Sequence, residues 1–317
     1  MKTQRTMIIA VCAMLLVGMS LLVPPSASAQ ATPALTTQVP PLPELQFSQI
    51  PAANRANYDG DRFSYMESGP KNAPVVLLLH GVGANSMHWR FQYPVLGQRY
   101  HVIAFNAPGY LLSDNLVAEK PTCENYGDAV NDFLTSLGIE KVYLLGNSFG
   151  SAVGQCFAAR YPQKVVKVVF TGTFIGEAQA TDEQRKAFMD GRKKQIQDGG
   201  YSFGSGRIAA LVGKNAPEDK LNMLRTVLRA TNPRGFIQAC YFLYTIMDSR
   251  QLASKLTMPI LMVQGTEDQV TPPAKNSYVL KPLLANAKLI EVQGAGHLPE
   301  FEMPDIVNKA VLEFFAQ

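Results

Sequence analysis

Short apolar runs that recur along the chain constrain its fold most strongly. They occupy residues 75–79 (Val-Val-Leu-Leu-Leu), 102–105, 142–145, 165–170 and 260–263, with a weaker run at 288–292. Continuous apolar runs of this length are typical of strands buried on both faces, as in parallel sheets. Amphipathic helical patterns lie between them, for example over 126–137. The alternation predicts an α/β fold with a mostly parallel, doubly wound sheet, to which residues 62–67 add an antiparallel edge strand.

The composition is that of a globular protein. Of 317 residues, 47% are hydrophobic and 17% are charged, against a usual charged share of roughly 25%. Such a chain can bury a large core, which excludes general disorder. The formal net charge is +4, and it falls to +2 (27 basic against 25 acidic residues) once Lys2 and Arg5 are removed with the segment described next. We therefore expect no nucleic-acid partner, because a nearly neutral chain offers no electrostatic footprint for one.

The first 29 residues have the features of a secretory signal peptide. Lys2 and Arg5 precede an uncharged stretch, residues 7–23, and Ala27-Ser28-Ala29 fits the small-residue cleavage rule. A retained anchor is the alternative, because this stretch lies at the short limit for spanning a bilayer. We expect cleavage before Gln30, export to the periplasm or the medium, and no stable membrane association afterwards.

Two further segments stand outside the alternation of strands and helices. Residues 30–54 contain five prolines among Thr, Gln and Ala, which predicts an extended linker and a fold that begins near residue 55. No strand-like run occurs over residues 175–255, where helical patterns cover 181–198, 206–213, 217–230 and 233–247. Because about 80 residues do not form a structureless loop in a compact domain, we expect residues 175–255 to be a helical cap. Residues 55–174 and 256–317 then form the core.

The cysteines predict little chemistry. Cys12 leaves with the signal peptide, and Cys123, Cys156 and Cys240 remain. At most one intramolecular disulfide can form among three cysteines, and the sequence leaves open whether any does. Cys156 falls on an apolar helix face, where buried structural thiols are common. We expect no redox or metal role for any of the three.

The most specific motif is Gly146-Asn-Ser148-Phe-Gly150, which directly follows the apolar run at 142–145. An apolar helical stretch over 151–161 comes next, so the motif stands between a buried strand and a helix. That is the setting of a nucleophile elbow, whose tight turn exposes the serine hydroxyl at the carboxyl end of the sheet. Ser148 is therefore the predicted nucleophile.

A serine hydroxyl needs an oriented base, and the base in turn needs an acid. His297 follows a predicted strand at the same end of the sheet as the elbow, and it is the predicted base. His88 lies on a predicted helix and His101 opens a strand, so both are expected to be surface or packing groups. Asp268, in the turn after the run at 260–263, is the predicted acid, with its neighbour Glu267 as the competing candidate.

The glycines of His80-Gly81-Val82-Gly83, just after the run at 75–79, let the backbone approach a bound carbonyl closely. The N–H of Val82 and the N–H of Phe149, which follows the nucleophile, are the predicted oxyanion-hole donors. His80 itself is expected to hydrogen-bond to the neighbouring backbone instead of taking part in catalysis.

Together these motifs resemble the α/β-hydrolase superfamily over about residues 58–316. Trp89-Arg-Phe91 and the stretch from Asn106 to Tyr110 are also similar to that family, although many members carry Asp where this chain has Asn106. The segment 232–240, followed by Asp248, is similar to the last cap helix of enol-lactone hydrolases. The elbow resembles that of carbon–carbon hydrolases of aromatic-ring degradation.

The motifs and the resemblance imply a serine hydrolase that cleaves a small carboxylic ester or lactone, its small-molecule partner, through an acyl-enzyme on Ser148. No metal and no organic cofactor are expected. Trp89, Phe236 and Tyr241 are candidates for the substrate pocket. A carbon–carbon bond hydrolase of the same fold is the alternative, and a ligand-sensing protein with a hydrolase-like fold is a third interpretation. The sequence leaves the oligomeric state open.

Overall fold

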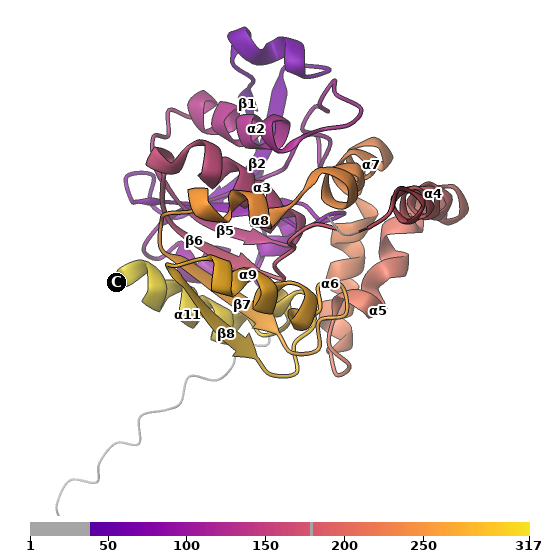
Figure 1. Cartoon of the computed structure of the whole chain (residues 1–317). Coiled ribbons are helices and arrows are strands. Elements are labelled where there is room, and N and C mark those ends of the chain that lie inside the picture. Colours follow the sequence, from indigo (N-terminus) through magenta and orange to yellow (C-terminus); the bar gives the residue numbers. More distant parts are fainter. Residues whose placement is uncertain (1–38, 178–179) are drawn as a thin grey trace, which may run out of the picture. The chain divides into compact units, whose positions relative to one another are not determined.

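A mixed sheet of eight strands organises residues 39–177 and 180–317, which the computed structural model describes (Figure 1). The strand order is β1-β2-β4-β3-β5-β6-β7-β8, in which β2 runs antiparallel to β1 and β4 while all pairs from β4 to β8 are parallel. The strands are β1 (Leu45–Gln49), β2 (Arg62–Ser68), β3 (Val75–Leu79), β4 (His101–Phe105), β5 (Val142–Asn147), β6 (Val165–Thr171), β7 (Ile260–Gly265) and β8 (Ala287–Val292). The predicted α/β fold with a mostly parallel sheet is confirmed.

Helices fill the connections between the strands. Those outside residues 175–255 are α1 (Tyr93–Leu96), α2 (Cys123–Ser136), α3 (Phe149–Arg160), α9 (Ser277–Leu280), α10 (Pro299–Glu302) and α11 (Pro304–Ala316). The 3-10 segments there are η1 (Ala52–Asn57), η2 (Ser86–Trp89), η3 (Pro162–Lys164), η7 (Pro273–Lys275) and η8 (Lys281–Leu283). Helix α2 begins earlier than its apolar face predicts because Thr122 caps it. Thr122 Oγ1 accepts a hydrogen bond from the N–H of Asn125, whose side-chain oxygen accepts one from the N–H of Thr122.

Both faces of the sheet are covered, as the apolar runs require. Val76 and Leu78 of β3 belong to an apolar cluster that includes residues of α1 and α11. Leu77 and Leu79 belong to a second cluster that includes residues of α2 and α3. Because successive side chains of a strand point to opposite faces, a strand between two helical layers must be apolar throughout.

Between β6 and β7, all the regular structure that is described is helical. The elements are α4 (Asp182–Gly199), η4 (Gly200–Arg207), α5 (Ile208–Leu211), α6 (Glu218–Arg229), α7 (Pro233–Tyr241), the π-helical turn η5 (Phe242–Ile246), α8 (Ser249–Leu252) and η6 (Ala253–Lys255). We call residues 175–255 the cap. Helix α4 packs against α7, and η4 against α4 and α6, whereas α8 packs on α3; α4 to α7 stand together at one side of the sheet in Figure 1. No helix within residues 39–177 and 180–317 combines the length and apolar character needed to cross a membrane.

The prediction of a linker over residues 30–54 is wrong for its second part. Residues from 40 onward belong to the folded unit, and β1 pairs with β2 from Leu45 opposite Met66 to Gln49 opposite Arg62. The antiparallel strand β2 is therefore not the edge of the sheet, as residues 62–67 were expected to be. Prolines flank β1 without interrupting it, which an edge strand tolerates because one side needs no hydrogen-bond partner. The predicted signal peptide, 1–29, lies outside the described residues.

A disulfide joins Cys123, the first residue of α2, to Cys156 on α3. The sequence leaves open whether a disulfide forms, and the structure answers this: Cys156 is buried on its apolar helix face, but it is bonded to Cys123 and is not a free thiol. Its helix face packs on α2, which brings the two Cα atoms to 5.3 Å. Cys240 is free and buried, and burial raises the pKa of its thiol to about 11, so it stays neutral at ordinary pH.

Removing this disulfide should lower stability. It joins cysteines 33 positions apart, and restricting the unfolded chain over such a loop is worth roughly 3–4 kcal/mol in the chain-entropy account. We expect the Cys123→Ala/Cys156→Ala variant to lose that much unfolding free energy in urea titrations, with Cys240→Ala as the matched control. Thiol titration of the denatured, unreduced chain without residues 1–29 should find only Cys240, and reaction of all three cysteines would contradict the disulfide.

Candidate active site

Ser148 stands in a strained turn between β5 and α3. Its backbone angles are φ 52° and ψ −112°, and a positive φ is uncommon for a residue that carries a side chain. Glycine is required on both sides of it. A Cβ atom on Gly146 would lie 2.5 Å from the carbonyl oxygen of Gly150, and one on Gly150 would lie 1.9 Å from the carbonyl oxygen of Leu79. The turn therefore has the close packing of a nucleophile elbow.

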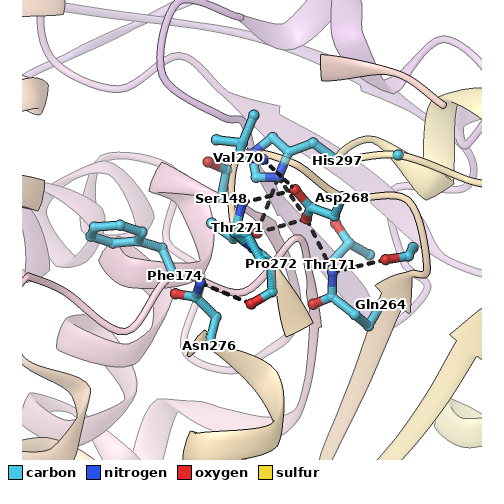
Figure 2. A network of polar contacts seen from close by, with 12 residues as sticks. Ser148, Thr171, Phe174, Gln264, Asp268, Val270, Thr271, Pro272, Asn276 and His297 are labelled. Atoms are coloured by element: carbon cyan, nitrogen blue, oxygen red, sulfur yellow. Dashed lines mark hydrogen bonds and ion pairs between the residues drawn. The ribbon is translucent and has the colours of Figure 1, made fainter. Parts of the chain in front are cut away.

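Three buried polar side chains meet where strands of the sheet end (Figure 2). Ser148 follows β5, Asp268 follows β7 and His297 follows β8. His297 Nδ1 lies 2.9 Å from Asp268 Oδ2, and Ser148 and His297 line one cavity. The exposed fractions of Ser148, Asp268 and His297 are only 5%, 4% and 2%. The structure thus brings together the three residues that were predicted to act as nucleophile, acid and base.

Asp268 is surrounded by hydrogen-bond donors. Its Oδ1 accepts from the N–H groups of Val270 and Thr271, each at 2.8 Å. Its Oδ2 accepts from Thr271 Oγ1 at 2.7 Å and from Gln264 Nε2 at 3.0 Å. Burial alone would raise the pKa of Asp268, but His297 and Thr271 outweigh burial and hold this pKa well below its ordinary value. An ionised Asp268 favours the Nδ1–H tautomer of His297, which leaves Nε2 able to accept a proton.

The predicted oxyanion-hole residues border Ser148. Val82 lines the same cavity as Ser148, and Phe149 is the first residue of α3, where amides have no partner within the helix. Among the described residues, none accepts a hydrogen bond from the N–H of Val82 or of Phe149. Two amide donors without partners, close to a serine hydroxyl, have the chemistry that stabilises a developing oxyanion.

His80 supports this loop through backbone contacts, as expected. Its Nε2 accepts a hydrogen bond from the N–H of Ala107 at 3.2 Å, so its Nδ1, which lies 2.9 Å from the carbonyl oxygen of Gly81, is the donor. Burial lowers the pKa of His80 to about 4. The ring is therefore neutral at ordinary pH, and both of its nitrogens are engaged.

The other two histidines pair with carboxylates. His88 Nε2 lies 2.7 Å from Glu300 Oε1, and both side chains are fully buried. His88 also lines the cavity beside Ser148. His101 opens β4, and its Nε2 lies 2.6 Å from Glu67 Oε2. Both are packing groups, as the sequence predicted.

Asn106 makes two hydrogen bonds of opposite sense at the end of β4. Its side-chain oxygen accepts from the N–H of Ser86 at 2.6 Å, and its Nδ2 donates to Ser64 Oγ at 3.0 Å. An ionised aspartate cannot donate the second bond. The amide therefore suits this loop.

The cavity over Ser148 is small because the cap closes it. Its volume is about 10 Å³, which has room for about one water molecule. The core contributes Gly81, Val82, Ala84, His88, Asn147 and Leu298 to its walls, and the cap contributes Arg207, Leu211, Leu224 and Leu228. A substrate larger than water therefore requires the cap to move, as lids do in many enzymes.

None of the three aromatic residues predicted for the substrate pocket lines this cavity. Trp89 is fully buried in the cluster that includes residues of α1 and α11. Phe236 is fully buried in a small cluster with Cys240. The Tyr241 ring lies 5.7 Å from the Lys120 ammonium group. Large aromatic side chains fill the layers between elements here, and the cavity wall is left to smaller apolar cap residues.

Glu302 ties the cap to the loop that carries His297. Its Oε2 accepts a hydrogen bond from the N–H of Gly213 at 2.6 Å, and its Oε1 accepts one from the N–H of Gly296 at 2.9 Å. The N–H of His297 itself donates to the carbonyl oxygen of Leu211 at 3.0 Å. The cap segment 211–213 is therefore bound to this loop at two neighbouring points.

We call the two hydrogen bonds that Glu302 accepts from Gly213 and Gly296 the Glu302 clamp. The carboxyl group of this clamp predicts that the stability of the protein depends on pH. Burial raises the pKa of Glu302 to about 7, although the N–H groups of Gly213 and Gly296 oppose it. A raised pKa means that folding takes up a proton, so the contribution of Glu302 to stability is fully present below its unfolded pKa of about 4.3 and is lost as the pH rises through about 7. Urea unfolding measures the free energy of unfolding of the wild type and of Glu302→Gln at each pH. We expect the wild-type value to fall by about 3 kcal/mol more than that of the variant between pH 4 and 8. A difference between the two proteins that is constant with pH would contradict this.

The residues that hold the predicted triad in place were not predicted from the sequence. Thr271 stands three residues after Asp268, a spacing at which an aspartate side chain can accept hydrogen bonds from the turn that follows it. Gln264 interrupts the apolar residues of β7, which is also a local signal. Asn147 donates through Nδ2 to the carbonyl oxygen of His297 at 3.2 Å, and its signal was a polar side chain in a buried turn.

Comparisons with known proteins agree with this geometry. A family model described as alpha/beta hydrolase fold matches residues 74–304. 3-oxoadipate enol-lactonase 1 of Acinetobacter baylyi is 24% identical over 266 residues, which cover 81% of this chain and 94% of that protein. A 2-hydroxy-6-oxononadienedioate/2-hydroxy-6-oxononatrienedioate hydrolase of Pseudomonas putida is 25% identical over 267 residues, covering 77% and 88%. A thermophilic esterase from Thermogutta terrifontis has the same fold, with a TM-score of 0.74 at 20% identity, covering 86% of this chain and 98% of that one.

Proposed function

The chain belongs to the α/β-hydrolase family, and from that premise we propose that it is an exported serine hydrolase that cleaves small carboxylic esters or lactones through an acyl-enzyme on Ser148. The comparisons support a hydrolase of ester, lactone or carbon–carbon bonds. The observation that carries the finer proposal is the arrangement of Ser148, His297 and Asp268. Ser148 stands in a strained turn and lines one cavity with His297. The Nδ1 atom of His297 contacts the buried carboxylate of Asp268.

The proposed reaction uses this arrangement in two steps. His297 Nε2 takes the proton of Ser148 as the hydroxyl oxygen attacks the substrate carbonyl, and Asp268 stabilises the imidazolium that forms. The N–H groups of Val82 and Phe149 hold the oxyanion of the tetrahedral intermediate. His297 then gives its proton to the leaving alcohol. In the second step His297 deprotonates a water molecule, which hydrolyses the acyl-enzyme and restores Ser148.

A panel of substrates tests this proposal. We expect purified protein to turn over 4-nitrophenyl esters of short acids and small lactones repeatedly, with a burst of nitrophenol as the acyl-enzyme accumulates. A chelator should leave the rate unchanged. Ser148→Ala is the matched control and should show no burst. Cleavage of a 1,5-diketone without cleavage of any ester would favour a carbon–carbon hydrolase, and a single slow turnover would favour a ligand sensor.

Export is supported by two features. Residues 1–29 have the pattern of a signal peptide, and the disulfide between Cys123 and Cys156 is of a kind that forms and persists in oxidising compartments. Protein recovered from the periplasm or medium of an expressing cell should begin at Gln30, which N-terminal sequencing checks. A chain that still carries residues 7–23 in the membrane fraction would mean a retained anchor.

A further inference from the structure

Arg207 carries a positive charge for which the described residues offer no carboxylate partner. It ends η4 in the cap, and its Nη1 donates to the carbonyl oxygen of Val82 at 3.3 Å. Its guanidinium lies 5.7 Å from the centre of the Phe236 ring. The titratable groups with the largest influence on its pKa are Arg192, Cys240, Tyr244 and Tyr110, and none of these is a carboxylate.

Arg207 lines both a cavity and a groove. One is the cavity that holds Ser148 and His297. The other is a groove of about 760 Å³, whose walls come from the cap and from Gln269 and Val270, directly after Asp268. The acidic residue of this groove, Asp198, is engaged by Lys194 at 2.8 Å. Arg192 adds a second positive charge to the groove, and Arg207 is the residue that the groove shares with the Ser148 cavity.

Arg207 is half-buried at the wall of this groove, and a half-buried arginine without a counter-charge is a candidate receptor for an anion. Burial lowers the pKa of Arg207, yet a guanidinium stays charged in proteins. The carbonyl oxygen of Val82 and the Phe236 ring are both uncharged, so among the described residues the five N–H donors of Arg207 have no charged acceptor. A carboxylate fits this fork in a bidentate manner and supplies the missing charge. A substrate that brings its own carboxylate would therefore complete the site.

We propose that Arg207 is the receptor for a carboxylate carried by the substrate, so that the natural substrate is an anionic ester or lactone whose scissile carbonyl lies at Ser148. This rests on the proposed ester and lactone hydrolysis. The carboxylate of the substrate contacts Arg207, which lines both the groove and the cavity. Hydrogen bonds from the guanidinium then replace those that water made to the free carboxylate. The interaction selects anionic over neutral substrates, and the chemistry at Ser148 is the same for both.

Matched esters that differ only in charge test the proposal. One series consists of monophenyl esters of glutaric and adipic acid, each compared with its terminal carboxamide. The other consists of 4-carboxyphenyl and 4-carbamoylphenyl butyrate, so that the charge is placed on the acyl or on the alcohol part. Hydrolysis is followed by pH-stat. In at least one series, kcat/KM for the carboxylate should exceed that for the carboxamide about 10–100-fold, the effect of one charge-assisted hydrogen bond.

Variants then assign this preference to a residue. Arg207→Gln should bring the ratio of the two kcat/KM values close to one, while Arg207→Lys should keep much of it. Arg229→Gln, an exposed arginine at the end of α6, is the matched control and should keep the wild-type ratio. If Arg207→Gln lowers both substrates by the same factor, Arg207 only positions Val82 and the proposal is overturned. It is also overturned if neither series shows a preference, or if Arg192→Gln abolishes the preference and Arg207→Gln does not.

Binding separates this proposal from the proposed function. Calorimetry with Ser148→Ala compares monophenyl adipate with its carboxamide and needs no turnover. Tighter binding of the carboxylate that disappears in Ser148→Ala/Arg207→Gln supports the receptor even if the wild type hydrolyses no ester, in which case the proposed function alone fails. Equal binding of both ligands, with ester hydrolysis intact, overturns the receptor alone.

Discussion

Ser148→Ala and His297→Ala are each expected to lower kcat by about 10⁶-fold, and the double variant should lose little more. The reason is that the two residues carry out one step. Without the hydroxyl oxygen there is no nucleophile for His297 to activate, and without Nε2 the hydroxyl is too weakly acidic to attack a carbonyl. The residual rate should come from substrate binding and from the N–H groups of Val82 and Phe149, which neither substitution removes.

The measurement is kcat for a good ester substrate with each single variant and with the double variant. His101→Gln is the matched control, because His101 is also paired with a carboxylate, Glu67. His101 lies beside Val75, the first residue of β3, whereas the predicted oxyanion loop follows the last residue of β3. The His101→Gln variant should keep near wild-type activity. Losses that multiply in the double variant would mean that Ser148 and His297 act independently, which contradicts an acyl-enzyme mechanism.

The sheet could be predicted because its strands lie between two helical layers. Each apolar run records burial on both faces, and β3 shows this directly, since alternate residues enter two different clusters. β1 was missed because it is an edge strand. Its side chains are intermediate or exposed, so its residues lack an apolar run, and the prolines around it predicted a linker instead. Where burial is incomplete, the sequence carries a weaker signal.

The candidate site, like the sheet, has residues that could be predicted from the sequence and residues that could not. Ser148, His297 and Asp268 were predictable because each stands at a fixed place relative to a strand, which the chain encodes locally. The clamp by Glu302 was not, because its partners are backbone N–H groups of Gly213 and Gly296 that no side-chain pattern marks. The pairing of Cys123 with Cys156 was not predictable either, since it depends on how α2 packs against α3.

Asp268→Asn is expected to lower kcat by about 10⁴-fold without unfolding the protein. The amide keeps the shape of the carboxylate, and its oxygen can still accept from the N–H groups of Val270 and Thr271. Its nitrogen, however, would replace Oδ2, which now accepts from Gln264, Thr271 and His297 Nδ1. An amide donor at that position favours the tautomer of His297 that carries its proton on Nε2, and this tautomer cannot take the proton of Ser148.

The neighbouring carboxylate supplies the matched control for this prediction. Glu267 Oε2 accepts a hydrogen bond from the N–H of Lys214 at 2.9 Å at the surface, so Glu267→Gln should keep near wild-type kcat. Because the pKa of Asp268 is held well below its ordinary value, Asp268 stays ionised across the neutral and mildly acidic range. Its effect on kcat should therefore be the same from pH 6 to 8. A nearly active Asp268→Asn together with an inactive Glu267→Gln would mean that Glu267 is the acid of the triad. The hydrogen bonds to Asp268 would then be structural.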